Sequence, residues 1–314
     1  MKKKRLLLFI VFSILLGVVI GANFDVAWLK NTIMPLTFVL VYPMMVTLNF
    51  RSLTEKMNYK LQITTQLINF IVFPLIAYGL GLLFFKEEPF LRLGLLLIAL
   101  LPTSGMTISW TVMAKGNVNA AIGMVVIGLL LGATLSAFYI SFLLGAEVEV
   151  PVWDIIQQIL LVVFVPLALA MVTQWVLIKQ FGKEKFNKSI KPVFPLFSTF
   201  GVVLIIFVAI SLKAKVIVSN PSIIIDMLIP LIIMYALFVI VSFTAARLLF
   251  NRSDGIALVN GTLIRALSLS LAITLSTFPD AKLTALLIAI AYTLQVQIAA
   301  WNVKLTDKLF KETA

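Results

Sequence analysis

Long apolar runs alternate with short polar segments over the whole chain. Most runs have about 18 residues or more, the length that an α-helix needs to cross the hydrocarbon core of a bilayer. The runs are continuous rather than alternating, which excludes a transmembrane β-barrel. The pattern predicts an all-α polytopic membrane protein of about ten helices. We place them at residues 6–21, 33–50, 62–84, 91–114, 118–144, 155–178, 192–212, 223–246, 255–277 and 282–303.

Charged residues lie between these runs and are distributed unequally. Basic residues concentrate in the N-terminal segment, in alternate loops and in the C-terminal tail, whereas acidic residues concentrate in the other loops. Because basic loops stay in the cytoplasm, we expect a multi-pass protein of the cell (inner) membrane with both termini cytoplasmic. Lys213 and Lys215 are exceptions on the predicted outer side. No small-residue cleavage site follows the basic N-terminus, so we interpret residues 6–21 as a helix rather than a signal peptide.

The composition excludes several classes of function. Hydrophobic residues make up 61% of the chain, and the mean hydropathy is +1.11. The net charge of +12 lies in membrane-flanking loops, so it predicts topology rather than nucleic-acid binding. Cysteine and histidine are absent, which removes disulfides, thiolate and imidazole metal sites and histidine proton relays. No cluster of acids or nucleophile with a base is visible, so we expect no enzyme, metal or cofactor.

The basic loop at residues 179–191 divides the predicted helices into two groups of five. An odd-numbered unit used twice must enter the membrane in opposite orientations, which is typical of an inverted repeat. We therefore predict two repeats of five helices each, at residues 1–150 and 151–314. The alternative is a count that is wrong by one or two helices, in which case no repeat exists.

The fourth span of each predicted half is interrupted. The first carries Pro102-Thr103-Ser104-Gly105-Met106-Thr107 near its middle, and the second carries Asn260-Gly261-Thr262 followed by Arg265. Helix breaks at membrane depth are tolerated only where they line a cavity or are buried in protein. Two breaks at corresponding places predict a substrate site at the bilayer midplane, and simple kinks are the alternative.

Arg265 is the formal charge that we place deep inside a predicted span. An unpaired arginine at that depth costs at least about 2.5 kcal/mol, so it should face water, a partner or a ligand. Three interpretations remain open. The side chain could attract an anionic substrate, replace a coupling cation, or extend to the cytoplasmic headgroups.

Hydroxyl and amide side chains surround Arg265 in the sequence pattern. Such groups can bind ions or substrate, but in membrane bundles they also join helices together. The candidate substrate-binding residues are Arg265, Thr103, Ser104, Thr107, Asn260, Thr262 and Ser268. A wider polar set comprises Ser109, Ser270, Gln66, Asn69, Gln295 and Gln297, and Trp110 and Met106 could shape a cavity or simply pack.

Three segments are similar to one known superfamily. The segment from Leu101-Pro102-Thr103-Ser104-Gly105 to Ala114-Lys115-Gly116-Asn117 resembles the fourth-span motif of bile acid:sodium symporters and arsenite-resistance permeases. Arg265-Ala266-Leu267-Ser268 is similar to their ninth-helix motif, and Tyr42-Pro43-Met44-Met45 looks like the arsenite-permease branch. The resemblance covers essentially the whole chain. It implies a panel domain, a core domain, and two broken helices that cross near the midplane.

The chain departs from both branches where they bind ions or arsenic. The Ser-Asn pair that follows the fourth-span break in sodium-coupled relatives corresponds to Thr107-Ile108, and the ninth-span carboxylate corresponds to Gly261 or a neighbour. The cysteine of the arsenite branch corresponds to Thr103, and its ninth-span acid to Ser268. The resemblance therefore implies a dismantled sodium site and no thiolate capture of arsenic.

These observations predict a secondary transporter that moves a small organic or oxyacid anion by alternating access. A proton-coupled or uncoupled cycle is expected rather than sodium symport. The alternative is an arsenite efflux permease, giving arsenic resistance by a cysteine-free route in which hydroxyls and amides hold neutral arsenous acid. The expected partners are the small-molecule substrate and the lipid bilayer.

Overall fold

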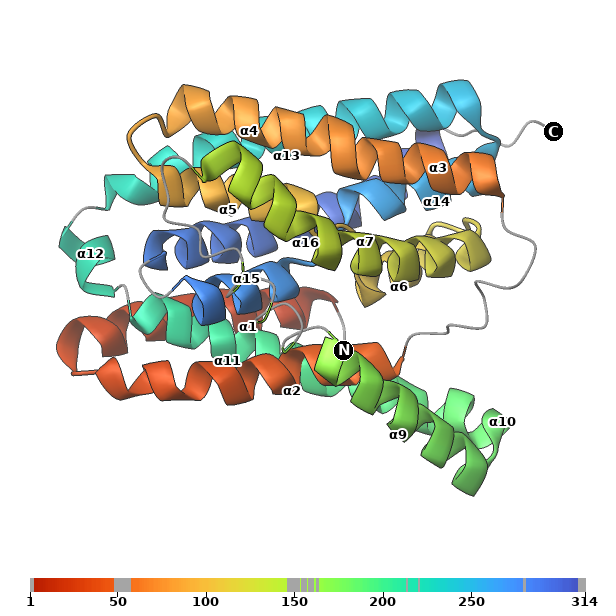
Figure 1. The fold of residues 1–314 in the computed structure, drawn as a ribbon, viewed down its shortest axis with the longest axis horizontal. Coiled ribbons are helices and arrows are strands. Elements are labelled where there is room, and N and C mark those ends of the chain that lie inside the picture. Colours follow the sequence, from red (N-terminus) through yellow and green to blue (C-terminus); the bar gives the residue numbers. More distant parts are fainter. Residues whose placement is uncertain are drawn as a thin grey trace. The chain divides into compact units, whose positions relative to one another are not determined.

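The computed structural model describes residues 3–47, 58–145, 164–212, 214–219, 221–278 and 281–309, with positions 153, 157 and 161. Within these residues the regular structure is helical, apart from one isolated β-bridge (Figure 1). The chain divides into two compact units, each described by itself. Unit 1 comprises Met1–Leu48, Pro151–Asp226 and Ser268–Ala289, and unit 2 comprises Asn49–Val150, Met227–Leu267 and Ile290–Ala314.

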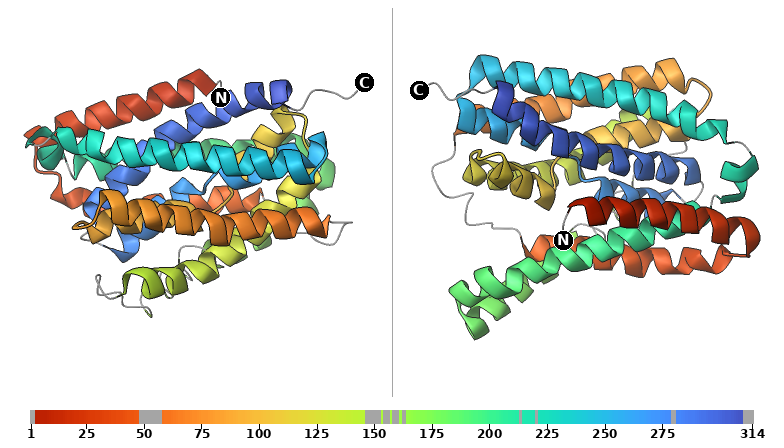
Figure 2. Two further views of the ribbon diagram at one scale, coloured as in Figure 1. Left: turned by 90° about the horizontal axis from the view of Figure 1, so that it is seen from above. Right: turned by 180° about the vertical axis from the view of Figure 1, so that it is seen from behind.

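Unit 1 is a group of apolar helices. Its elements are α1 (Lys3–Asn23), η1 (Ala27–Thr32), α2 (Ile33–Val46), α9 (Val165–Phe181), α10 (Lys183–Lys185), η5 (Phe186–Ile190), η6 (Lys191–Val193), α11 (Phe194–Ser211), α12 (Ala214–Ser219) and α15 (Leu267–Thr277, from Ser268 onward). Helix α11 packs against α1 and α2, and α2 also packs against α9 (Figure 2). The hydroxyls of Tyr42 in α2 and Thr173 in α9 share a hydrogen bond of 2.7 Å.

Unit 2 contains both interruptions, although the second interrupted span continues into unit 1 as α15. Its elements are α3 (Tyr59–Leu67), η3 (Ile68–Val72), α4 (Phe73–Phe84), α5 (Pro89–Leu100), α6 (Gly105–Met113), α7 (Val118–Leu144) and α14 (Arg252–Leu263). Two long helices, α13 (Ser222–Leu249) and α16 (Lys282–Leu309), begin in unit 1 and continue into unit 2. Helix α5 is buried at every position from Leu91 to Leu100, as expected for a helix that is apolar on nearly all sides.

Asparagine side chains cap three helices of unit 2. The Oδ1 atoms of Asn58, Asn117 and Asn251 accept hydrogen bonds from backbone amides in the first turns of α3, α7 and α14. The Nδ2 atoms of Asn58 and Asn117 both donate to the carboxylate of Asp254, at 2.9 and 2.7 Å. The starts of α3, α7 and α14 are therefore tied to one carboxylate in the first turn of α14.

The helices agree with the predicted spans, with two qualifications. Four helices are long and apolar enough to cross a membrane, namely Tyr59–Phe84, Val118–Leu144, Ser222–Leu249 and Leu283–Val303. Together with shorter apolar helices they support a polytopic membrane protein, whereas the count of ten crossings stays a prediction. The start of the predicted span 155–178 lies largely outside the described residues.

The compact units do not coincide with the predicted halves. Each unit takes residues from both 1–150 and 151–314. A division of this kind describes packing and says nothing about the orientation of one half relative to the other. The inverted relation of the two halves stays a prediction.

Candidate functional site

The first break lies between α5 and α6 and has a local cause. Helix α5 ends at Leu100 and α6 begins at Gly105, with Pro102 between them. Thr103 adopts a left-handed φ of 61°, which is costly for a residue with a β-branched side chain. Ser104 then caps α6, because its Oγ accepts from the amide of Met106 and its own amide donates to Thr107 Oγ1 at 3.1 Å.

The second break lies later than the sequence analysis predicts. Asn260, Gly261 and Thr262 belong to α14, and the interruption is at residues 264–266, with Arg265 inside it. Gly261 does not break the helix. A Cβ at Gly261 would lie 2.5 Å from Met124 Sδ, so glycine allows α14 to pack closely on α7.

The two breaks cross each other and pair through their backbones. The amide of Thr103 donates to Ile264 O at 2.8 Å, and the amide of Ala266 donates to Leu101 O at 2.8 Å. These bonds form an antiparallel bridge between Pro102 and Arg265. Unwound backbone at membrane depth needs internal partners, and each break supplies partners for the other. The two interruptions therefore meet within unit 2, at a point that we call the crossing.

The guanidinium of Arg265 is enclosed at this crossing. Arg265 as a whole is 0% exposed to solvent. Nε donates to Ile98 O at 3.0 Å, and Nη2 donates to Ala99 O. Nη1 donates to Thr262 O at 2.9 Å and to Asn69 Oδ1 at 2.7 Å. All three side-chain nitrogens thus have protein acceptors, so the side chain does not extend to the headgroups.

These acceptors are suited to a cation. The carbonyls of Ile98 and Ala99 lie in the last turn of α5, and that of Thr262 lies in the last turn of α14. Helix C-termini carry partial negative charge, and such ends with unwound carbonyls coordinate cations in other transporters. No carboxylate pairs with Arg265 in the described part of the chain. Helix ends and one amide, rather than an acid, therefore stabilise its charge.

Side chains from three further elements surround the backbone and side chain of Arg265. Gln295 in α16 accepts from the Arg265 amide at 2.8 Å and donates to its carbonyl at 3.1 Å. Tyr235 in α13 donates to Gln295 Oε1 at 3.2 Å, which joins α13 to α16. The stacked rings of Phe73 and Phe238 lie 5.5 and 5.9 Å from the guanidinium carbon. Cation–π contact adds to the stabilisation of the buried charge.

Asn69 reaches Arg265 from a local irregularity in a long helix. It lies in the π-helical turn η3, directly before the segment with Pro74. Its Oδ1 accepts from Arg265, and its Nδ2 donates to Gly261 O at 3.0 Å. Single π-helical turns often occur where a side chain has a functional role. The Asn69 amide thus bonds to the last turn of α14, through Gly261 O, and to the Arg265 side chain that follows it.

The predicted site residues are only partly brought together. Thr103, Ser104, Thr107, Thr262 and Arg265 lie at or beside the crossing in unit 2, and all five are buried. The hydroxyl of Thr262 is engaged with Ser242 Oγ at 2.7 Å, while its carbonyl binds Arg265. Ser268 belongs to unit 1, so its position relative to the crossing is not described.

Asn260 forms a buried amide pair one turn before the break. Its Oδ1 accepts from Asn302 Nδ2 at 2.9 Å. Asn260 Nδ2 and Asn302 Oδ1 are buried and have no hydrogen-bond partner among the residues that the structure describes. Ile264, one turn after Asn260, packs in a small cluster with Trp110 and Ala299. Asn260 therefore keeps free hydrogen-bonding capacity, although it does not contact Arg265.

Several contributors to the crossing carry little or no signal in the sequence. Backbone carbonyls of Ile98 and Ala99 carry no sequence signal, because every residue has a carbonyl. Tyr235 is a polar tip within an apolar run, which is a weak signal at best. Among the described residues, no three acidic, histidine or cysteine side chains gather in a way that could hold a metal ion.

Comparison with known proteins identifies relatives. The profile of the Sodium Bile acid symporter family matches residues 34–220. Uncharacterized protein YbaS of Bacillus subtilis is 32% identical over 124 residues, covering 39% of this chain and 40% of that protein. Arsenical-resistance protein Acr3 of Corynebacterium glutamicum is 26% identical over 192 residues, covering 58% and 52%. Acr3 of Alkaliphilus metalliredigens is 22% identical over 254 residues, covering 74% and 71%.

These matches agree with the resemblance seen in the motifs. The aligned regions span about half or less of the first two relatives, so the match alone does not assign those relatives' activities to this chain. The profile match covers more than half of the 314 residues and includes the first break. The superfamily and its arsenite-permease branch are confirmed as relatives. The chain therefore belongs to the Sodium Bile acid symporter family and is an integral membrane protein.

Proposed function

We propose that the chain moves a small organic or oxyacid anion across the membrane by alternating access, without sodium. One observation carries the proposal: a buried arginine lies where the two helix breaks meet, and no carboxylate pairs with it among the described residues. The helix ends and the amide that hold this guanidinium are dipoles without formal negative charge, so a positive potential remains in a region of low dielectric. The N-terminus of α6 begins at the same break and adds positive potential.

The surroundings of Arg265 support the proposed independence from sodium. Four oxygen atoms from Ile98, Ala99, Thr262 and Asn69 already hold a permanent cation, the guanidinium. A dissolved sodium ion would have to displace a tethered charge from this position. The cycle is therefore proton-coupled or uncoupled. Arg265 acts on the substrate through its potential, since its side-chain nitrogens are bonded to the protein.

Alternating access fits the division of the chain. Both breaks and the contacts of Arg265 belong to unit 2, which suggests that the crossing moves as one body. Helix starts tied to Asp254 would keep this unit together during the cycle. In this proposal both termini lie in the cytoplasm.

A direct test is transport by the purified protein in liposomes. Wild-type protein should take up or exchange a small anion equally well in sodium and in potassium buffer. The variant Arg265→Gln should lose transport. The control Arg92→Gln removes a different buried arginine, which lies in α5, and should retain most of the transport. Unchanged transport by a folded Arg265→Gln protein would exclude the proposed role of the charge.

Ligand binding can be screened before transport is measured. A ligand that binds only the folded state raises the unfolding temperature, and the increase grows with the ratio of ligand concentration to Kd. Small anions should stabilise the wild-type protein without sodium. Stabilisation by sodium alone would contradict the proposed cycle.

The similarity to Acr3 proteins supports a second candidate, arsenite efflux. The chain has no cysteine, so arsenous acid would have to be held by hydroxyls and amides. Expression in an arsenite-sensitive host distinguishes the candidates. Increased resistance would favour efflux, and unchanged resistance with anion uptake in liposomes would favour the anion transporter.

A further inference from the structure

A lysine-rich corner follows α9 in unit 1. Residues 179–191 contain five lysines and a single acidic residue, Glu184. The lysines are Lys179, Lys183, Lys185, Lys188 and Lys191. Glu184 already forms an exposed ion pair with Lys188 at 2.7 Å. In the described part of the chain, no carboxylate pairs with Lys179, Lys183 or Lys185, and all three are exposed.

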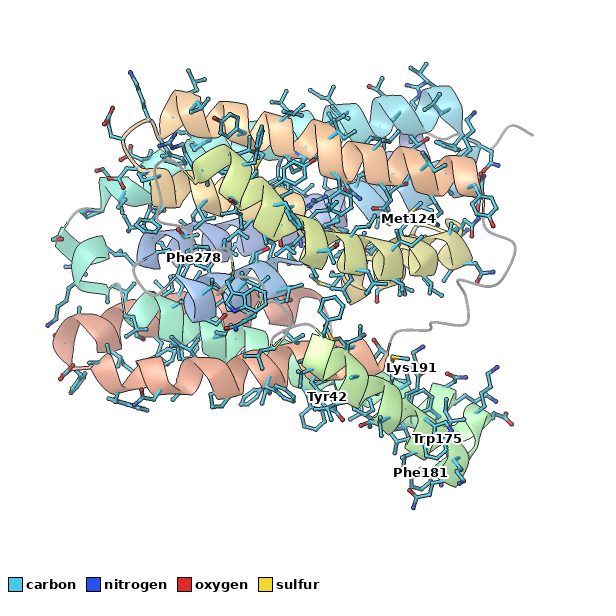
Figure 3. All side chains as sticks on the ribbon, in the orientation of Figure 1. Tyr42, Met124, Trp175, Phe181, Lys191 and Phe278 are labelled. Carbon is cyan, nitrogen blue, oxygen red and sulfur yellow. The ribbon has the colours of Figure 1, made fainter. Side chains whose placement is uncertain are left out.

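Two of these lysines lie over exposed aromatic rings. Lys179 Nζ is 5.0 Å from the ring centre of Trp175, and Lys185 Nζ is 5.2 Å from that of Phe181. The rings are 62% and 39% exposed, and Figure 3 shows them on the same corner as Lys191. Aromatic rings with basic neighbours are typical of the headgroup region of a bilayer. Burial also lowers the pKa of Lys191, so a nearby anion would favour its charged form.

An apolar stripe on α9 leads to this corner. Val165, Leu169, Val172 and Val176 are exposed and follow one another at intervals of three or four residues, so they share one face. Lys179 comes three residues later on that face. The stripe from Val165 to Val176 is about 16 Å long at 1.5 Å per residue, close to half of the hydrocarbon thickness of about 30 Å.

We propose that this corner binds an anionic phospholipid, with the headgroup on the exposed lysines and an acyl chain along the stripe of α9. Basic charge alone would suit a free phosphate equally well. The stripe decides for a lipid, because an acyl chain of one leaflet matches its length and apolar character. This inference holds whatever substrate the chain transports, since its residues are remote in sequence from both breaks.

The experiment is a lipid titration of the full-length protein. Purified protein in neutral phosphatidylcholine nanodiscs receives increasing phosphatidylglycerol, and bound lipid is counted by native mass spectrometry. The test variant carries Lys179→Gln, Lys183→Gln and Lys185→Gln. The matched control carries Lys60→Gln, Lys86→Gln and Lys215→Gln, three exposed lysines outside the corner. Both variants lose the same charge.

The proposal predicts a difference between the variants. Each lysine near an anionic surface contributes to the binding affinity, and the loss of three contributions should weaken phosphatidylglycerol binding about a hundredfold. The control should bind as the wild type does. Equal weakening in both variants would show general attraction by net charge and overturn the site.

A second arm distinguishes a lipid from free phosphate. Glycerol phosphate carries the headgroup charge without an acyl chain, so it should not displace the bound lipid at equal concentration. Substituting Leu169→Ser and Val172→Ser should weaken lipid binding while all lysines remain. Efficient displacement by glycerol phosphate, with no effect of the serine substitutions, would overturn the lipid assignment.

Discussion

The two helix breaks in unit 2 have different physical origins. The break between α5 and α6 is built locally, from Pro102, the left-handed backbone of Thr103 and the cap at Ser104. The break between α14 and α15 contains Ile264, Arg265 and Ala266, none of which prevents helix formation. Its backbone is held open by Gln295, by the bridge to the first break and by the contacts of the Arg265 side chain.

This difference shows that similar geometry can have a local or a tertiary cause. The first break should persist when single contacts are removed, because covalent geometry disfavours helix at Pro102. The second break should depend strongly on its contacts, since the intrinsic propensity of its residues allows a helix. Substitutions at the two breaks should therefore differ in effect.

The largest effect is expected for Arg265→Ala. It leaves Ile98 O, Ala99 O, Thr262 O and Asn69 Oδ1 without their donor in a buried site. Each buried unsatisfied group costs about 1–3 kcal/mol, so the loss of stability should exceed about 3 kcal/mol. Thermal unfolding in detergent measures it. Added guanidinium at millimolar concentration should restore part of the stability, and wild-type stability of the variant would contradict the tertiary origin of the second break.

A smaller loss is expected for Asn69→Ala. The substitution removes one acceptor of Arg265 and the donor to Gly261 O, but the backbone acceptors remain. The expected loss is about 2 kcal/mol. Gln66→Ala, one turn earlier on the same helix, is the control, because neither polar atom of the Gln66 amide has a hydrogen-bond partner in the described part of the chain. Equal effects of the two substitutions would mean that Asn69 acts only through packing.

The backbone of the first break can be tested at Thr103. Glycine adopts a positive φ without steric cost, whereas alanine does not. Thr103→Gly should therefore be more stable than Thr103→Ala by about 1 kcal/mol. Comparing the two variants cancels the loss of the hydroxyl, which bonds Pro102 O at 2.7 Å. A more stable alanine variant would show that Thr103 does not need its left-handed conformation.

The smallest effect is expected at the cap of α6. Ser104→Ala removes the acceptor of the Met106 amide and should cost about 1 kcal/mol. Ser109→Ala is a control in the same helix, since Ser109 is exposed. The two unfolding temperatures should differ by a few degrees at most. A loss as large as that of Arg265→Ala would mean that the first break also depends on single tertiary contacts.

Much of the helical framework could be predicted from the sequence. Apolar runs of sufficient length indicate membrane helices because the bilayer requires every backbone group to be bonded within the helix. Pro102 located the first break, since proline lacks the backbone donor and clashes with the preceding turn of a helix. The second break was placed four residues too early, at Asn260-Gly261-Thr262 rather than at residues 264–266. Gly261 is predicted to be part of the interruption. In fact it allows close packing on Met124.

The sequence by itself determined that a formal charge, Arg265, lies deep inside an interrupted apolar span, because the bilayer sets the length of each span. Only the tertiary structure decided how that charge is held. Its acceptors come from α3/η3, α5 and α14, segments far apart in the sequence, and three of the four are backbone carbonyls. Carbonyls are present at every residue, so their convergence depends on where two helices end and cross, which no local pattern encodes.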